Sequence, residues 1–349
     1  YKDPYYATFF TQAIGHNTIL VGGNPESQTI PDTLQFKALK RYPRITDSLT
    51  SEFYDGVQAE LSSVYQNRLL RYVRQIVFVK PDYFIVFDDL MANGRPEVLD
   101  SLLHLPNRDK VKVADLTATY TAEKGTLVVR SFPSSMATAT VKDGRIPYQV
   151  FSTRTPADLP EQPVYLDFKT VKPVSDAQFL TAIVPAKSES AAVSLSKQIT
   201  ENSGEFARGV RVLRGGKTDL VMFRVGPLAK MIVAGRWSAE AASLVVTESG
   251  DVLERFAVQQ ARSLNHGERR LFSSTSPVSI AANLNSNEVE VVCNSAEAAK
   301  VSLLVANKPT RILMDGKEMS SREYSFSANS KTISFDLPIG QHELKISIR

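Results

Sequence analysis

Two of the four histidines lie in sequence contexts that suit chemistry. His16 stands in AIGHNTILVGG, after a glycine that lets the backbone come close to a ligand and directly before a β-branched strand. His104 lies in DSLLHLPN, where the flanking leucines are equally compatible with a half-buried imidazole of the core. An imidazole transfers protons near neutral pH or binds a metal ion. His16 is therefore the first candidate for a functional side chain.

The other histidines and the single cysteine give weaker signals. His266 lies among turn residues in LNHGERR, and His342 precedes a terminal strand. Cys293 lies in the strand-like run EVEVVC, where we expect a buried small side chain, and one cysteine cannot form an internal disulfide. The basic run KALKRYPR, residues 37–44, is compatible with a solvated loop or with contacts to sulfate or uronate groups, which arginine binds through paired hydrogen bonds.

Charge and hydropathy narrow the possible partners. The 349 residues carry 41 lysines and arginines against 37 aspartates and glutamates, a formal net charge of +4. This excess is too small to indicate nucleic acid, but it is compatible with an acidic polysaccharide. No apolar run is long enough for a membrane span, and no secretory signal opens the sequence. The chain begins YKDPYYATFF without an initiator methionine, so we expect further residues upstream in the natural product.

The elements that must position these side chains are predicted to be strands. Short runs rich in valine, isoleucine, tyrosine and phenylalanine recur between clusters of turn residues along most of the chain. RQIVFV and YFIVFDDL flank KPD, which predicts a hairpin, and the pair Asp88 and Asp89 is expected to cap a turn. Helical periodicity is weak throughout. The sequence therefore predicts an all-β protein of the sandwich class.

A change in the residue pattern near residue 275, from longer strand-like runs to a polar segment and then shorter runs, predicts a domain boundary. The polar segment SSTSPVS leads into a series of compact strand-like runs with Asp-Gly and Pro-x-Gly turns, which suit hairpins. We expect a large antiparallel β-sandwich over residues 1–275 and a smaller β-sandwich over residues 276–349.

Three stretches, in this order, resemble the β-domain of heparinase II/III-like polysaccharide lyases. YYATFFTQAIGHNTILVGGNPESQ is similar to the start of that domain, with an aromatic stretch, a His-Asn-Thr motif, an apolar strand, a glycine and a glutamine. FYDGVQAELSSVYQNRLLRYVRQIVFVKPDYFIVFDDL resembles the later signature of the family, and SLLHLP resembles its strand that ends in histidine. The resemblance covers residues 1–106. In this signature, we expect Tyr65 and Arg74 to have structural roles.

The resemblance implies an architecture and a reaction. Members of the family join an upstream α/α toroid to a large antiparallel β-sandwich (a super-sandwich), and this chain contains only the second part. The implied reaction is β-elimination on a uronate-containing polysaccharide such as a glycosaminoglycan or alginate, with the toroid supplying much of the catalytic apparatus. Within the sandwich, the resemblance implies His16 as a catalytic residue that faces the cleft and Tyr54 as a supporting tyrosine.

A structural zinc ion is the rival use of His16. The family often holds zinc through two histidines and a carboxylate, which implies His16 and His104 here with Glu60 as the carboxylate and Asp32 as the alternative. Some members pair two histidines around the first strand, whereas this chain has Ile14 at that position. One imidazole cannot serve both purposes, so catalysis and metal binding stay alternatives for His16.

Two functions from different classes remain. The first is the β-domain of a lyase that acts outside the cytoplasm, in the periplasm or after secretion, and that needs its upstream toroid. The second is a non-catalytic carbohydrate-binding or scaffolding β-sandwich protein. His16 and His104 are expected by the first and incidental to the second.

Overall fold

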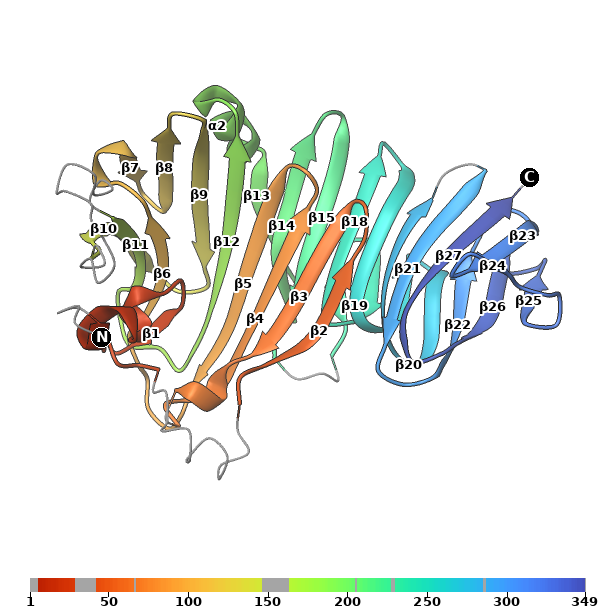
Figure 1. Cartoon of the computed structure of the whole chain (residues 1–349), viewed down its shortest axis with the longest axis horizontal. Helices are drawn as coiled ribbons and strands as arrows, with labels where there is room; N and C mark the ends of the chain where they lie inside the picture. The colour runs from red at the N-terminus through yellow and green to blue at the C-terminus, as the bar shows by residue number, and fades with distance from the viewer. Residues whose placement is uncertain are drawn as a thin grey trace, which may run out of the picture. The chain divides into compact units, whose positions relative to one another are not determined.

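Strands make up most of the part of the chain that the structure describes. The computed structural model describes residues 6–28, 42–65, 67–145, 163–204, 206–226, 230–284 and 287–348. Within these ranges it is an all-β protein built from antiparallel sheets, with one α-helix (Figure 1). The predicted fold class, an all-β sandwich, is therefore confirmed.

The first part of the chain, up to the helix, holds most of the sequence motifs. Its elements in chain order are η1 (Tyr6–Phe10), η2 (Ala13–Gly15), β1 (Ile19–Val21), β2 (Arg44–Thr50), β3 (Tyr54–Glu60), η3 (Ser62–Val64), β4 (Leu69–Val79), β5 (Tyr83–Ala92), β6 (Leu99–Leu105), η4 (Arg108–Lys110), β7 (Val111–Ala114), β8 (Thr117–Ala122), β9 (Gly125–Pro133), β10 (Ala137–Asp143), β11 (Val164–Thr170), β12 (Asp176–Ala186) and α2 (Glu189–Lys197).

The described residues of the second part form strands and no helix. They are β13 (Ile199–Gly204), β14 (Ala207–Arg214), β15 (Lys217–Arg224), β16 (Ile232–Ala234), β17 (Trp237–Glu240), β18 (Ser243–Ser249), β19 (Val252–His266), β20 (Arg269–Leu284), β21 (Glu288–Ser295), β22 (Ala299–Leu304), β23 (Pro309–Met314), β24 (Lys317–Glu318), β25 (Tyr324–Ser327), β26 (Thr332–Leu337) and β27 (Gly340–Ile348).

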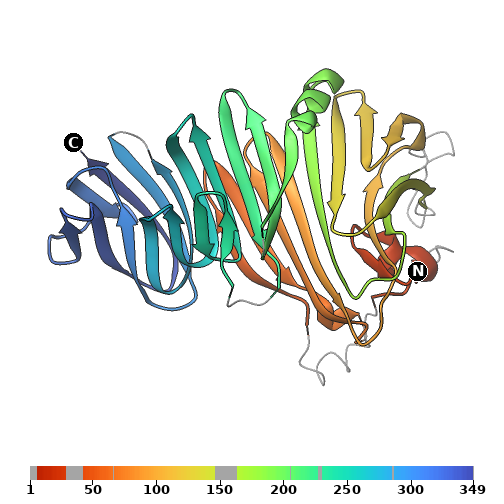
Figure 2. The ribbon, with the colours of Figure 1, turned by 180° about the vertical axis from the view of Figure 1, so that it is seen from behind.

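The strands form three sheets. A four-stranded sheet has the order β1-β6-β11-β10, and an eight-stranded sheet has the order β2-β3-β4-β5-β12-β9-β8-β7. The third sheet has 15 strands, β13 to β27. Strands β12, β9 and β8 lie side by side in both views (Figures 1 and 2).

The chain divides into two compact units. Unit 1 comprises Tyr1–Ile45, Ala59–Ile76 and Asp82–Ser196, and unit 2 comprises Thr46–Gln58, Val77–Pro81 and Lys197–Arg349. No helix among the described residues is long and apolar enough to cross a membrane.

Unit 1 contains the four-stranded sheet and those parts of the eight-stranded sheet that lie outside Thr46–Gln58 and Val77–Pro81. One buried cluster joins Val21 and Phe168 of the first sheet to Tyr72 and Phe179 of the second. Strand alternation explains this core, because even positions of β11 point inward and odd positions point outward. On the outward face of the four-stranded sheet, Tyr165 packs in a second small cluster against the N-terminal turns.

The predicted hairpin around KPD is confirmed. Strands β4 and β5 are neighbours in the eight-stranded sheet and are joined by residues 80–82. The expectation that Asp88 and Asp89 cap a turn is wrong, because both lie within β5 and are buried. Each is paired with an arginine of β4, Asp88 with Arg74 and Asp89 with Arg71. Strand pairing across the hairpin, which brings the arginines opposite the aspartates, makes this burial tolerable.

Strand β20 connects two layers of unit 2. Its first half pairs with β22 at Phe272–Ser274, and its second half pairs with β21 at Val278–Leu284. The change of partner falls near residue 275, where the sequence suggested a domain boundary, but β20 itself continues through that point. The later strands contribute to one core with β18 and β19, and Cys293 is buried within it as predicted.

Candidate active site

The His-Asn-Thr motif lies in a turn that strand pairing places beside His104. The turn connects η2 to β1, a strand of three fully buried residues. β1 pairs antiparallel with β6, with Ile19 opposite Ser101, and the Thr18 carbonyl accepts a hydrogen bond from the Leu102 amide at 2.9 Å. The motif is thereby brought to the part of β6 that carries His104.

Asn17 joins the turn to His104 and to Arg74. Its side-chain oxygen Oδ1 accepts a hydrogen bond from the backbone amide of His104 at 2.7 Å and lies 3.0 Å from the ring nitrogen Nδ1. Arg74 donates a hydrogen bond to the backbone carbonyl of Asn17. Side-chain and backbone groups of Asn17 are therefore both held by other strands.

Thr18 is held on the other side of the motif by a closed hydrogen-bond network. The hydroxyl of Tyr65 donates to the Ile19 carbonyl at 3.0 Å and lies 2.9 Å from Thr18 Oγ1. The amide of Gln28 donates to both hydroxyl oxygens, at 2.8 Å to Thr18 and 2.9 Å to Tyr65. Burial raises the pKa of Tyr65 to about 12, so this phenol stays protonated at neutral pH. The structural role predicted for Tyr65 is confirmed.

Arg74 is fixed by a bidentate ion pair with Asp88. Its Nε lies 2.6 Å from Asp88 Oδ1 and its Nη2 lies 2.9 Å from Oδ2. Burial lowers the pKa of Arg74, but the charge of Asp88, the hydrogen bonds to it and the neighbouring phenols of Tyr72 and Tyr65 together outweigh burial, and the pKa is raised. Arg74 is therefore a permanent cation that anchors the turn, which confirms its predicted structural role.

His104 is a half-buried imidazole with an acceptor at each nitrogen. Its Nε2 lies 3.1 Å from the Ile14 carbonyl oxygen, and its ring lies between those of Phe9 and Tyr165, with centroids 6.1 and 5.4 Å away. Each neutral tautomer can donate to only one of the two acceptors, Ile14 O or Asn17 Oδ1. Burial lowers the pKa of His104, and the nearby His16 lowers it further, while the bond to Ile14 opposes this.

His16 is exposed between these anchored residues. Its neighbours Asn17 and Thr18 are tied to β4, β6 and the end of η3, so the backbone that carries the imidazole is fixed although the ring itself faces solvent. The backbone is held and the ring is accessible. This combination suits a side chain that acts on a ligand bound at the surface of the sandwich.

Removing His16 tests whether the two imidazoles are close in solution. We expect His16→Ala to raise the pKa of His104, because the positive charge of His16 disfavours protonation of its neighbour. The imidazole C–H resonances of His104, followed by NMR across the acid range, measure this shift. His342→Ala, which removes an imidazole bonded to Asp315, is the control and should leave the titration unchanged. If the titration midpoint of His104 were the same in His16→Ala as in the wild type, the two rings would be too far apart to interact.

The same titration has a consequence for stability. Because the pKa of His104 is lower in the folded state than its ordinary value of 6.5, the unfolded chain takes up the proton first as the pH falls. The contribution of His104 to stability is thus complete above pH 6.5 and is lost as the pH falls through the folded pKa.

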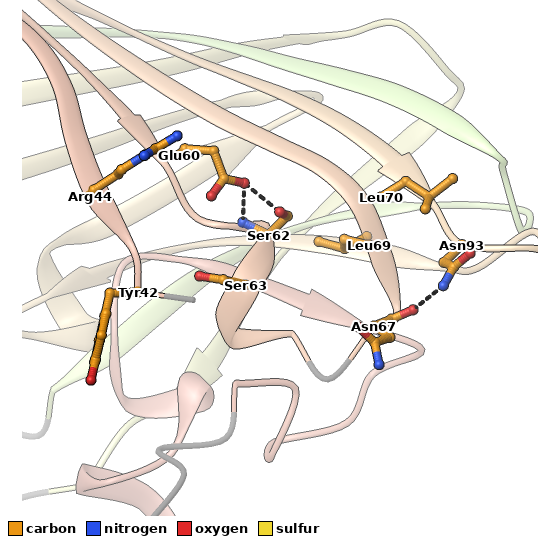
Figure 3. A pocket seen from close by; sticks show the side chains of 9 residues that line it. All are labelled: Tyr42, Arg44, Glu60, Ser62, Ser63, Asn67, Leu69, Leu70 and Asn93. Carbon is orange, nitrogen blue, oxygen red and sulfur yellow. Dashed lines mark hydrogen bonds between the residues drawn. The ribbon is translucent and has the colours of Figure 1, made fainter. Parts of the chain in front are cut away.

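Glu60 lies in a separate hollow of unit 1, at the end of β3. One of its carboxylate oxygens, Oε1, accepts hydrogen bonds from the backbone amide of Ser62, at 2.8 Å, and from the Ser62 hydroxyl. Figure 3 shows Glu60 and Ser62 along one side of this pocket, with Tyr42 and Asn67 farther from them.

Tyr54 belongs to the core of unit 2. Its side chain is 1% exposed, and its hydroxyl donates to Gln259 Oε1 at 2.9 Å. Burial raises the pKa of Tyr54, so the phenol is held neutral. In this position the phenol supports packing of unit 2 and is closed off from solvent.

The three residues expected to bind zinc are not brought together. Among the described residues, no three side chains of the types His, Cys, Asp and Glu form a group that could hold a metal ion. Both ring nitrogens of His104 face protein oxygen atoms, and Glu60 is bonded to Ser62. His16, Glu60 and His104 therefore do not fit zinc in this arrangement. Asp32 lies outside the described residues, so a zinc site that uses it stays a prediction.

Comparisons with known proteins find likeness in fold alone. No protein-family model matches the sequence, and no curated protein matches it. Among solved structures, the chain is similar to the heparan sulfate lyase HepC from Pedobacter heparinus, with 15% identity, a TM-score of 0.46 and coverage of 61% of this chain and 30% of that one. A structure of heparinase III gives 17% identity, a TM-score of 0.45 and coverage of 62% and 30%.

A chondroitin AC lyase from Streptomyces coelicolor A3, solved with chondroitin sulphate, covers more of the chain. The identity is 10%, the TM-score is 0.46, and the coverage is 88% of this chain and 36% of that one. The chain thus spans about a third of the length of the structures it matches. At these identities and TM-scores the likeness is one of fold and carries no function over to this chain.

Proposed function

We propose that this chain is the β-sandwich part of a polysaccharide lyase that cleaves a uronate-containing polysaccharide by β-elimination. The observation that carries the proposal is the exposed imidazole of His16, presented by a turn whose next two residues are anchored to distant strands. The order of the three sequence motifs that resemble heparinase II/III-like lyases supports the same reading.

The reaction sets the demands on the site. A base removes the proton at C5 of the uronate, the electron pair forms the C4–C5 double bond, and the C4–O4 bond breaks while the departing oxygen gains a proton. The C5 proton is acidic enough only when hydrogen bonds or a cation offset the charge on the carboxylate. An imidazole within reach of C5 or of the carboxylate supplies one of these functions. In this proposal His16 is that group, and His104 is a positioning residue that acts through Asn17.

The remaining catalytic groups are proposed to come from an upstream α/α toroid in the same natural product. The family resemblance implies such a toroid, and the acidic substrate would lie against the exposed face of the His16 turn. We also place the protein outside the cytoplasm, in the periplasm or secreted, because its polymeric substrate would be met there.

The experiment is a product assay on the full natural protein. Heparan sulfate, chondroitin, hyaluronan and alginate are incubated separately, and products are followed by ultraviolet absorbance and mass spectrometry. The proposal expects an unsaturated uronate at the new non-reducing end of at least one polymer, with a mass lower by one water than the hydrolysis product. Saturated products would indicate a hydrolase. Binding without any cleavage would favour the non-catalytic carbohydrate-binding alternative, and either result would overturn the proposal.

A further inference from the structure

Unit 1 carries a polar pocket that the proposed reaction does not use. Its volume is about 650 Å³, within the range of roughly 300–1,000 Å³ that is usual for small-ligand sites. The lining side chains come from the start of β2, the end of β3, η3, the start of β4 and the end of β5 (Figure 3): Tyr42, Arg44, Glu60, Ser62, Ser63, Asn67, Leu69, Leu70 and Asn93.

Several polar groups of the pocket are held in place. Ser62 fixes one oxygen of the Glu60 carboxylate through its amide and its hydroxyl. The side-chain amide of Asn93 donates to the Asn67 carbonyl at 2.6 Å, and the Asn93 backbone amide donates to the Arg68 carbonyl at 2.8 Å. A ligand would therefore meet these groups already oriented, which reduces the entropy that binding costs.

A cation and an anion both line the pocket. Arg44 stands at the start of β2 and Glu60 at the end of β3, and these strands are neighbours in the eight-stranded sheet. Figure 3 shows the Arg44 side chain extending to the same side of the pocket as Glu60.

The formal charges of the lining residues cancel. Among the lining residues that the structure describes, Arg44 is the one cation and Glu60 the one anion, and the other polar members are hydroxyls and amides. A pocket for a uronate or a sulfate would need an excess of positive charge, since a nearby carboxylate repels such groups. Carboxylate, guanidinium and amide groups together suit sugar hydroxyls, which both donate and accept hydrogen bonds.

Apolar surface at the pocket suits the C–H face of a sugar ring. Tyr42 is 46% exposed and Leu70 is 60% exposed, although both are large side chains. In Figure 3, Tyr42 lies at one end of the pocket and Leu70 near the other. An aromatic ring with a polar tip is a common contact surface at wet binding sites.

We propose that this pocket is a subsite for an uncharged sugar unit, such as the N-acetylhexosamine that alternates with uronate in glycosaminoglycans. For its substrate class this inference rests on the function proposed above. In the subsite, Glu60 accepts hydrogen bonds from sugar hydroxyls, Arg44 and Asn93 donate to hydroxyl or acetamido oxygens, and Tyr42 contacts the ring face.

Saturation-transfer NMR and calorimetry on the wild-type chain test the subsite without catalysis. The probes are N-acetylglucosamine, N-acetylgalactosamine and sodium glucuronate. We expect an N-acetylhexosamine to bind, glucuronate to bind more weakly, and the affinity for the neutral sugar to be insensitive to salt, because no ionic contact is formed. Tyr42→Ala and Glu60→Gln should each weaken binding by about tenfold or more, since each removes a principal contact.

Control substitutions outside the pocket, and a check that each variant is folded, allow the binding results to decide whether the pocket binds the sugar. Met136→Ala and Glu123→Gln replace exposed side chains of unit 1 outside the pocket and should bind as the wild type does. Glu60→Gln keeps an oxygen for the Ser62 amide, and circular dichroism confirms that each variant is folded. Preference for glucuronate, undetectable binding of both neutral sugars, or binding that survives both pocket variants would overturn the subsite. Failure of the lyase assay alone would leave these binding results standing.

Discussion

Replacing His16 by alanine is expected to lower the lyase rate of the full natural protein by about 100- to 10,000-fold, the range that a positioned proton-transfer group contributes. The imidazole is exposed, and the neighbouring residues Asn17 and Thr18 are held by His104 and Tyr65, so the substitution removes a functional group and no packing. The loss should fall on kcat more than on KM, because the imidazole acts on groups that change charge in the transition state. Initial rates from ultraviolet absorbance measure it.

A histidine elsewhere in the chain provides the control for this prediction. His342→Ala removes an imidazole from β27 in unit 2, where it contacts Asp315, and should keep the wild-type rate. Thermal unfolding of His16→Ala should match the wild type to within about 0.5 kcal/mol, as is usual for exposed side chains. If His16→Ala kept the wild-type rate, His16 would have no part in the chemistry.

The second large effect is expected on stability, from Arg74→Met. Arg74 is 16% exposed and Asp88 is 2% exposed, so the substitution leaves a buried carboxylate without its partner. We expect the free energy of unfolding to fall by about 3–5 kcal/mol. Because Arg74 also donates to the Asn17 carbonyl, the turn that presents His16 should loosen as well. Urea unfolding followed by fluorescence and circular dichroism measures the loss.

Two further variants show how much of the stability cost comes from breaking the buried ion pair and how much from losing any arginine. Arg95→Met breaks a pair with Glu97 in which the arginine is 78% exposed, and it should cost less than about 1 kcal/mol. The double variant Arg74→Met with Asp88→Leu should recover much of the stability, because it removes the uncompensated charge. A cost for Arg74→Met no greater than that for Arg95→Met would show that the buried pair does not hold the hairpin.

Local sequence patterns predicted many of the strands, but they did not single out β10 or β11. The runs that form β4 and β5 are rich in valine, isoleucine, phenylalanine and tyrosine and flank a Lys-Pro-Asp turn, and strand propensity and turn chemistry both act over a few residues. The one described α-helix, Glu189–Lys197, was not predicted. It is a short element in which Ser188 Oγ accepts from the Ala191 amide, and its serines gave little helical periodicity.

The site depends on contacts that no local pattern contains. His104 and Asn17 are 87 residues apart in the sequence and are hydrogen-bonded because β1 pairs with β6. Thr18 and Tyr65 are 47 residues apart and are hydrogen-bonded because Tyr65, at the end of η3, lies next to the turn. Family resemblance pointed to the motifs, but it did not show that Asn17 and Thr18 anchor the turn while His16 stays exposed. The arginine partners of Asp88 and Asp89 likewise follow from strand pairing across the hairpin.

The position of Glu60 illustrates the same limit. In the sequence it precedes a pair of serines and suits a metal ligand, whereas the fold binds it to Ser62 in a pocket with Arg44 and Tyr42. The basic run at residues 37–44 already contained both of the latter side chains. Only the fold shows that the end of this run and the Glu60 carboxylate line the same pocket.

The most direct test of the central claim compares a native uronate polysaccharide with its carboxyl-reduced form, in which each uronate has become a neutral hexose. β-Elimination needs the carboxylate to make the C5 proton acidic, so the full natural protein should generate unsaturated, ultraviolet-absorbing ends on the native polymer and none on the reduced one. Absence of such ends on every native uronate polymer, or equal cleavage of the reduced form, would contradict the account.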